Sequence, residues 1–292
     1  MMGPFIPLNI LALLLYAAPA AAYGAGLVLD ARNAPVFDNR LRLPGLARPL
    51  LFTGIGVQVA ATGAWCVNTH LSPFAAEYGT LSVLAWIMAL ALAAADLKYH
   101  ITAVNAAALP IACLILFWGL LHADRTPDEA LLLKSQAISV HVLCILTSLA
   151  LFALAFGCAC CYLLQHRLLK SRSVRPFLRR LPPLATLDTV AYQAIAFGLP
   201  LLAVGLGLGI VYMAKDKPWL TPLQWIFDPH NFIAFALLFL YGLYIAARLL
   251  FGWRGVRLQY ILVAGLILAM ALYIVPNVTH HFHQQSGLSA KA

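Results

Sequence analysis

Long apolar stretches separated by short polar connections run through the whole chain. A membrane-spanning helix needs about 20 apolar residues, and eight stretches approach or exceed that length: residues 5–29, 49–67, 80–97, 101–122, 137–164, 190–214, 230–251 and 256–276. No stretch alternates apolar and polar residues in the manner of a membrane β-barrel. The pattern therefore predicts an all-α protein, a polytopic integral membrane helical bundle of about eight transmembrane helices.

The composition supports this class. Hydrophobic residues make up 63% of the chain and charged residues 10%, whereas soluble domains are about 45–50% apolar and about 25% charged. The polar connections are too short to fold as a separate soluble domain, so we expect the lipid bilayer to be the protein's main environment.

Basic residues are distributed unevenly between the two sides of the predicted bundle. Fourteen of the 19 Lys and Arg residues fall on one side: Arg32, Arg40, Arg42, Arg48, Lys98, Arg167, Lys170, Arg172, Arg175, Arg179, Arg180, Arg248, Arg254 and Arg257. Positively charged connections stay in the cytoplasm, so both termini are predicted to lie outside. Topology and contact with anionic lipids explain the net charge of +9, and no nucleic-acid partner is expected.

The N-terminal stretch "NILALLLYAAPAAAYGAG" has the small residues of a signal-peptide cleavage site, but no basic segment precedes it. Cleavage near Ala22 would place the Arg-rich first connection outside and reverse every later connection against its charge. We therefore expect residues 5–29 to be retained as the first helix.

Histidines gather on the predicted outer side. Seven of the nine lie there, far apart in the sequence: His70, His122, His141, His230, His280, His281 and His283. A single histidine at this depth is usually an ordinary interfacial residue, but the joint clustering favours ligands for haem iron or another transition metal. A zinc site would need cysteines to converge with them. Cys158 and Cys161 have C-x-x-C spacing, yet small thiols in an apolar helix are more often packing residues.

The stretch "PLQWIFDPHNF", at 222–232, combines two aromatic residues with polar ones where the seventh helix begins: Trp225, Phe227, Asp228, Pro229 and His230. Pro229 suits the first helical turn and Asp228 the N-cap. The two aromatic side chains could form an apolar wall for haem. An interfacial aromatic belt with a helix cap explains the pattern equally well.

Residues 187–230 resemble the cytochrome c assembly family, the CcsA and ResC group with its CcmC and HemX relatives. The matching positions are Leu187, Asp188, Tyr192, Ile195, Gly198, Pro200, Leu201, Leu202, Trp225, Asp228 and Pro229. The helix from residue 139 resembles the family helix that opens with a haem-ligating histidine, here His141. Residues 274–283 resemble the C-terminal segment that carries the second outer histidine, and residues 70–86 resemble an outer loop more weakly.

The chain also departs from the family pattern. Phe227 replaces a Trp, Pro222 replaces a Gly, and His230 and Asn231 stand where Lys-Glu is usual. Ala246 stands where core members carry an intramembrane histidine in an L-H-T-R context. These departures bring the chain closer to HemX-like members.

The resemblance implies a b-type haem, bound non-covalently at the outer face between His141 and one of His280, His281 and His283. His283 is slightly favoured over His281. The haem wall would comprise Trp225, Phe227, Asp228, Pro229 and His230.

The resemblance also implies a bacterial cytoplasmic-membrane protein that presents haem to an apocytochrome c with a CcsB/ResB-like membrane subunit, as part of a holocytochrome c synthase. Residues 1–67 would form an N-terminal two-helix membrane region and residues 68–292 the haem-handling domain. Two alternatives are a HemX-like regulator of haem synthesis and a small-solute transporter. The transporter is disfavoured because inverted repeats are not evident in the sequence and intramembrane ionisable residues are nearly absent.

Overall fold

Helices account for nearly all of the structure, a computed structural model that describes residues 5–31, 43–123, 136–170, 182–216 and 229–268. The α-helices are α1 (Phe5–Ala31), α2 (Leu43–Thr69), α3 (Glu77–Tyr99), α4 (Thr102–Leu121), α5 (Gln136–Lys170), α6 (Leu184–Asp216), α8 (Pro229–Leu250) and a last helix, Val256–Leu268. A short 3-10 helix, η1 (Pro73–Ala75), precedes α3. Seven of the described helices are long and apolar enough to cross a membrane, and the described residues contain no strand. The predicted all-α, multi-pass membrane bundle is confirmed.

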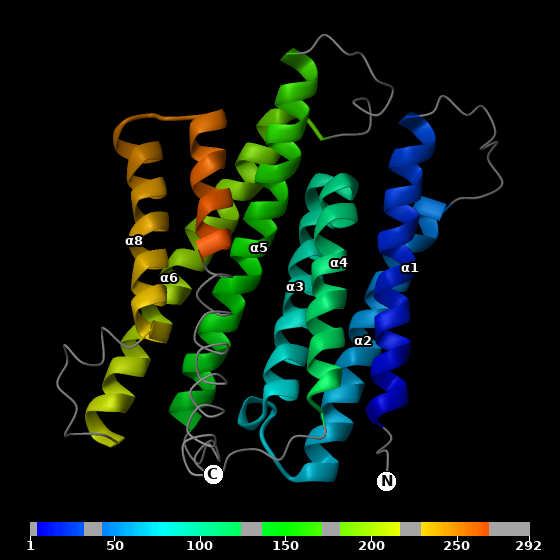
Figure 1. Cartoon of the computed structure of the whole chain (residues 1–292), viewed down its shortest axis with the longest axis vertical. Helices are drawn as coiled ribbons and strands as arrows, with labels where there is room; N and C mark the ends of the chain where they lie inside the picture. Colours follow the sequence, from blue (N-terminus) through cyan, green and yellow to red (C-terminus); the bar gives the residue numbers. More distant parts are fainter. Residues whose placement is uncertain (1–4, 32–42, 124–135, 171–181, 217–228, 269–292) are drawn as a thin grey trace, which may run out of the picture.

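Successive helices run in opposite directions, which gives the bundle two distinct ends (Figure 1). α3 turns into α4, and α8 into the last helix, at the upper end of Figure 1, which we call the inner end. The opposite end, where η1 joins α2 to α3, is called the outer end. These names follow the charge distribution, and the orientation in a membrane stays a prediction.

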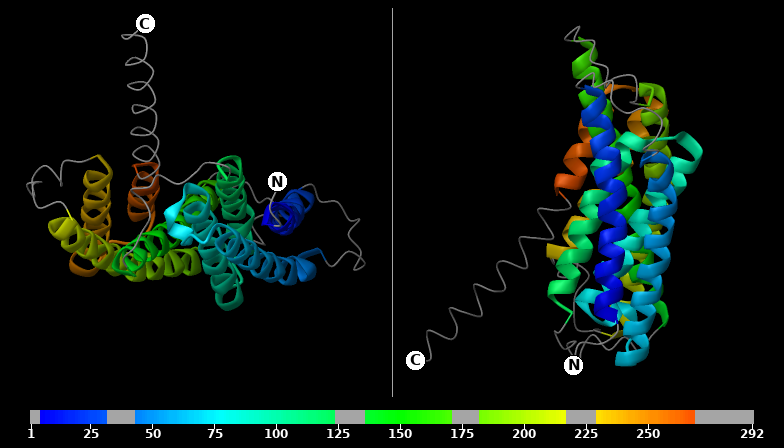
Figure 2. Two further views of the ribbon diagram at one scale, coloured as in Figure 1. Left: turned by 90° about the horizontal axis from the view of Figure 1, so that it is seen from below. Right: turned by 90° about the vertical axis from the view of Figure 1, so that its right-hand side faces the viewer.

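The helices form two groups joined by α5. α1 packs on α2 and α4, and α3 packs on α2, α4 and α5, while α5 runs along α6 and α6 contacts α8. Figure 2 looks along the helices and shows α1 to α4 on one side of α5, with α6, α8 and the last helix on the other. One buried apolar cluster extends from Ala12 in α1 to Leu262 in the last helix, so the two groups share a core.

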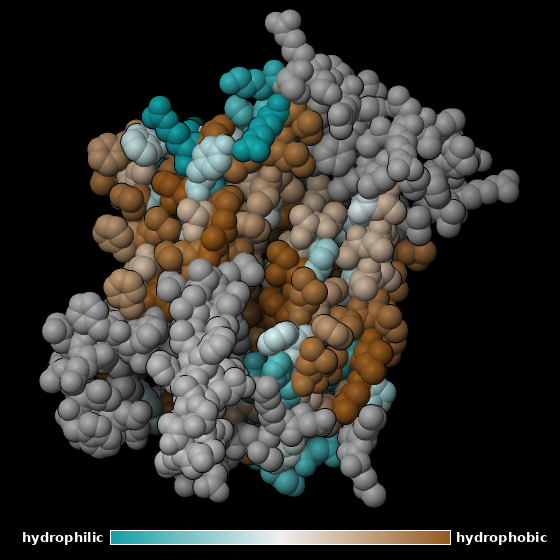
Figure 3. Space-filling view, in the orientation of Figure 1, coloured by the Kyte–Doolittle hydropathy of each residue, from teal (hydrophilic) through white to brown (hydrophobic). Residues whose placement is uncertain are grey.

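Large apolar side chains also cover the outside of the bundle. Phe239 is 75% exposed and Val67 is 72% exposed. Hydrophobic residues dominate the middle of the face in Figure 3, whereas hydrophilic residues gather towards its upper and lower ends. An apolar belt of this kind is expected where side chains face lipid.

Glycines bring α5 and α6 close together. A Cβ added at Gly198 would lie 2.7 Å from Cε1 of Phe152, and one added at Gly205 would lie 2.7 Å from Cδ1 of Ile145. The two glycines are seven residues apart and share one face of α6. Membrane helices commonly pack through such small residues because van der Waals contact drives their association.

Helix bounds agree with the predicted stretches but extend beyond several of them. α3 begins at Glu77 instead of residue 80, and α6 begins at Leu184 instead of residue 190. Arg48, predicted to lie in the first connection, is within α2. A helix continues past the apolar run as long as its backbone hydrogen bonds do, and hydropathy does not detect that extension. Residues 269–276 of the predicted eighth helix lie outside the described residues.

Candidate functional site

His141 is the sixth residue of α5, near its outer end, and is half-buried against α6. Its Nδ1 atom is 2.6 Å from the backbone carbonyl oxygen of Gly205. A carbonyl oxygen only accepts hydrogen bonds, so Nδ1 carries the proton and donates it. In the neutral ring, the lone pair of Nε2 is then available to a ligand or metal.

The imidazole has space only because the adjacent residue of α6 is glycine. A Cβ at Gly209 would lie 2.8 Å from Cε1 and 3.2 Å from Nδ1 of His141. Any other residue at position 209 would therefore push the ring away from the Gly205 carbonyl. Gly205 and Gly209 are one helical turn apart, so a single face of α6 both makes room for the ring and holds it.

This geometry fits one axial ligand of a haem. Metal-ligating histidines usually donate their second ring N–H to a carbonyl or carboxylate, which fixes the tautomer and the ring plane. Of the residues that the structure describes, no group of three or more His, Cys, Asp or Glu side chains converges as a metal site. Within the described ranges, His141 is thus not part of a multi-residue metal cluster, and a haem iron requires only one such ligand from each side.

The other predicted haem contacts fall mostly outside the described residues. This holds for Trp225, Phe227 and Asp228, for His280, His281 and His283, and for the side chain of His230. α8 begins at Pro229, the position predicted for its first turn. The end of α6 and the start of α8, which flank the aromatic segment, lie at the same outer end as His141 (Figure 1).

The remaining outer histidines with described side chains have different surroundings. Nδ1 of His122 is 2.8 Å from the carbonyl oxygen of Trp118 in its own helix, and the two rings are 4.9 Å apart. His70 directly follows α2, has a left-handed backbone with φ 57°, and is exposed. His122 therefore matches the interfacial interpretation, whereas His141 is held by a second helix.

Asp188 joins three helices in the inner half of the C-terminal group. Its Oδ2 atom accepts from Arg248 Nη2 of α8 at 2.7 Å, and its Oδ1 atom accepts from Gln259 Nε2 of the last helix at 2.9 Å. The Arg248 guanidinium carbon also lies 4.4 Å from the centre of the Tyr192 ring. Asp188 and Tyr192 had matched the family pattern without a role. The sequence signal that could have revealed this cluster is the presence of acidic and basic residues within apolar helices, because such groups usually pair.

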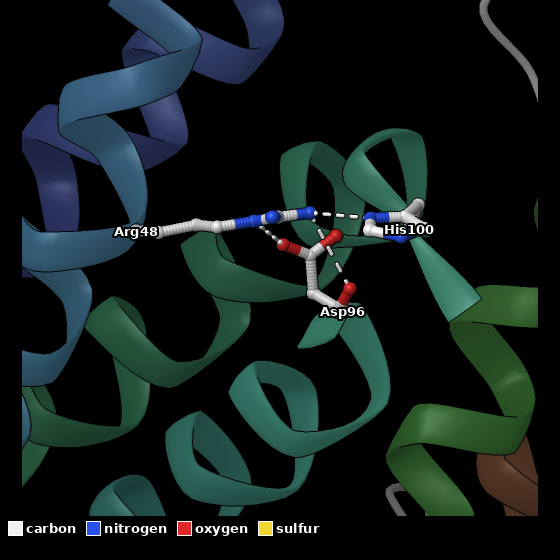
Figure 4. A network of polar contacts seen from close by, with 3 residues as sticks. All are labelled: Arg48, Asp96 and His100. Atoms are coloured by element: carbon white, nitrogen blue, oxygen red, sulfur yellow. Dashed lines mark hydrogen bonds and ion pairs between the residues drawn. The ribbon is translucent and has the colours of Figure 1, made fainter. Parts of the chain in front are cut away.

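A second ion pair, with a buried carboxylate and a partly exposed arginine, lies at the inner end of the N-terminal helices (Figure 4). Nε of Arg48 donates to Oδ2 of Asp96 at 2.7 Å, and Asp96 is only 2% exposed. Nη2 of Arg48 is 2.9 Å from Nδ1 of His100, which must accept because a guanidinium only donates. In the sequence, ionisable groups are nearly absent from the predicted membrane helices. The structure shows two internally neutralised pairs instead, and neither leaves a net charge.

A sequence profile described as "Cytochrome C assembly protein" matches residues 74–283, well over half of the chain. The chain belongs to the cytochrome c assembly protein family. The match includes His141, Asp188 and Arg248, and it begins after α2. Membership places this multi-pass membrane protein among proteins of cytochrome c assembly.

Individual relatives include two kinds of protein. Protein HemX of Brevibacillus brevis is 39% identical over 90 residues, 30% of this chain and 33% of that protein. Protein HemX of Bacillus subtilis is 28% identical over 151 residues, 52% of this chain and 53% of that protein. Cytochrome c biogenesis protein CcsA of Guillardia theta is 24% identical over 234 residues, 74% of this chain and 76% of that protein. The chain therefore spans about a third and about half of the two HemX proteins.

Proposed function

We propose that this chain is a haem-handling protein of cytochrome c biogenesis in the bacterial cytoplasmic membrane. It binds a b-type haem non-covalently at the extracytoplasmic face and presents it for attachment to an apocytochrome c. A CcsB/ResB-like membrane subunit acts with it, and the two together form the synthase.

The hydrogen bond from His141 to the Gly205 carbonyl is the observation that carries this proposal. It holds the ring in the tautomer that ligates iron, at the predicted outer end of the bundle. Haem, when bound, supplies an iron that accepts axial imidazole ligands and vinyl groups that react with cysteine thiols. The chain's own part is to hold, orient and expose the haem.

The second axial ligand is assigned to the C-terminal segment, to one of His280, His281 and His283. Trp225 and Phe227 supply the apolar wall beside the ring. Asp228 caps α8, Pro229 begins that helix, and His230 follows within the same wall. Because the tail histidines are close in sequence, they can substitute for one another.

The test is haem content and axial ligation of the protein purified from membranes. We expect His141→Ala to lose most of its bound haem, and added imidazole to restore it by filling the vacated axial position. His122→Ala is the matched control, since its ring also binds a backbone carbonyl at the outer end. Single tail substitutions should be mild, and removal of all three tail histidines should reproduce the loss seen with His141→Ala.

Two results would contradict the proposal. A wild-type protein without a Soret band, supplied with haem in the cell, would remove haem handling. Unchanged axial ligation in the variant lacking His141 and all three tail histidines would remove this ligand set, and His230 and His70 would become the next candidates.

A second function, membrane regulation of haem synthesis in the manner of HemX, is favoured by a separate observation. Local identity reaches 39% over 90 residues to the HemX protein of Brevibacillus brevis, against 24–29% to CcsA proteins, and Ala246 replaces the intramembrane histidine of core members. Deleting the gene separates the two functions. Loss of haem attachment with unchanged haem synthesis supports cytochrome c assembly, whereas altered haem synthesis with continued attachment supports regulation.

A further inference from the structure

The Asp188 carboxylate contacts all three helices of the C-terminal group that follow α5. It belongs to α6, binds Arg248 of α8 through one oxygen and binds Gln259 of the last helix through the other. The Asp188 and Arg248 side chains are each 14% exposed, and Gln259 is fully buried. Both oxygens are therefore committed in a site that solvent barely reaches.

Asp188 lies at the inner end, but the three helices that it joins run to or from the outer end of the molecule. The outer end of α6 leads into residues 217–228, α8 leads out of them, and the last helix leads into the C-terminal segment. Every residue assigned to haem other than His141 lies in these connections or at the start of α8. Asp188 thus ties together, at their inner ends, the three helices that carry those segments.

We propose that Asp188 and Arg248 are positioning residues that set where the outer ends of α6 and α8 lie relative to His141. This inference rests on the proposed function. The part of α6 between Asp188 and Asp216 is about 42 Å long, at about 1.5 Å per residue. A tilt of about 5° at the inner end of such a helix would move its outer end by roughly 3–4 Å. Ligands and ring contacts do not tolerate such a displacement.

A role in metal ligation does not explain the pair. The position that holds a histidine in core family members is Ala246, two residues before Arg248. No cluster of three metal-ligating side chains occurs here or elsewhere in the described ranges. The arginine also lies over Tyr192, one helical turn after Asp188, so its planar group is held on two sides. A fixed guanidinium that joins helices suits a geometric role, because its donors have fixed directions.

The control is the other ion pair that joins two helices, Arg48 with Asp96, in which the arginine is more exposed than Arg248. It lies at the same inner end and has the same 2.7 Å separation, but it joins α2 and α3 of the N-terminal helices. Asp96→Asn should therefore remove an ion pair with the same separation without altering the outer ends of α6 and α8.

The experiment compares Asp188→Asn, Arg248→Lys and Asp96→Asn in the full-length protein purified with haem. We expect Asp188→Asn to weaken haem affinity roughly 10-fold, the lower range for residues that orient metal ligands, and to change the axial-ligation spectrum. Arg248→Lys keeps the charge but loses the planar fork, so its affinity should be intermediate. Asp96→Asn should retain the wild-type affinity and spectrum.

Hydrogen–deuterium exchange of backbone amides gives a readout that does not need haem. Asp188→Asn should exchange faster at the outer ends of α6 and α8, with α1 to α4 unchanged. Equal exchange at those ends in Asp188→Asn and Asp96→Asn would overturn the inference. If the wild-type protein binds no haem, the proposed function fails, and the exchange comparison still decides whether the ion pair positions the outer ends.

Discussion

His141 owes its orientation to a neighbouring helix. The carbonyl of Gly205 accepts its Nδ1 proton, and Gly209 leaves the space that its ring occupies. A backbone carbonyl does not titrate and cannot change rotamer, so the ring keeps its acceptor for as long as α5 and α6 stay packed. In the proposed function, this hydrogen bond orients the ring before haem binds.

Substitution of Gly209 tests this preparation. Gly209→Ala places a methyl group 2.8 Å from Cε1 of His141, and the ring is the group that can move. We expect haem occupancy to fall several-fold while the protein stays in the membrane, measured as Soret absorbance per mole of purified protein. Gly207→Ala, where a Cβ would meet nothing within 4 Å, should leave occupancy unchanged, and an equal fall in both variants would contradict the role of Gly209.

Sequence and resemblance could predict His141 but not the residues that hold it. Gly205 is 64 positions away, and its contact depends on how α5 and α6 are rotated against each other. The same limit applies to Asp188 and Arg248, which are 60 positions apart. A single sequence shows that each charged residue needs a partner, but it does not show which one.

At the scale of elements, the α5–α6 pair depends on close approach. Gly198 lies against the ring of Phe152, and that ring also packs on Tyr241 of α8, with centroids 4.3 Å apart. A larger residue at position 198 would disturb the contacts of α6 with α5 and of α5 with α8. The glycine is therefore a packing requirement of three helices.

We expect Gly198→Leu to destabilise the fold by roughly 1–3 kcal/mol, the usual cost of overfilling a packed interface. The measurement is the unfolding free energy in mixed detergent micelles. Gly207→Leu, on an exposed position of the same helix, provides the control and should change this free energy far less. Equal stability of the Gly198→Leu protein and the wild type would show that α5 and α6 are not closely packed at this point.

The hydropathy pattern predicted each described α-helix, but several helices extend beyond the ends that it predicted. The apolar run of α5 was predicted to end at residue 164, yet the helix continues to Lys170. Its last turns carry His166, Arg167 and Lys170. These polar side chains are compatible with a helix end that lies beyond the hydrocarbon region. Basic residues near a helix C-terminus also interact favourably with the helix dipole.

At the scale of the whole molecule, the two ends differ in charge. The connections at the inner end carry most of the basic residues, whereas the start of α5, which carries His141, lies at the outer end (Figure 1). The division into a region of residues 1–67 and a region of residues 68–292 stays a prediction at this scale. α1 packs on α4 as well as on α2, so the first region contacts the second directly.

Reporter fusions test the orientation. With both termini outside, alkaline phosphatase fused after Ala292 should be active, and a reporter that works only in the cytoplasm should be inactive there. A fusion in the connection after α5, at Arg175, should give the opposite result and serves as the internal control. Activity of the cytoplasmic reporter after Ala292 would reverse the assignment of the two faces.

The unequal lengths of α4 and α5 imply that these two helices respond differently to bilayer thickness. α4 has 20 residues and α5 has 35, or about 30 Å and about 52 Å, while a typical hydrocarbon core is about 30 Å thick. α4 therefore just matches the core, and α5 exceeds it. Lipids with longer acyl chains would submerge His100 and the adjacent Arg48–Asp96 pair, whereas α5 would still reach water. A change in the acyl-chain length of the host membrane thus acts on the turn between α3 and α4 before it acts on the ends of α5.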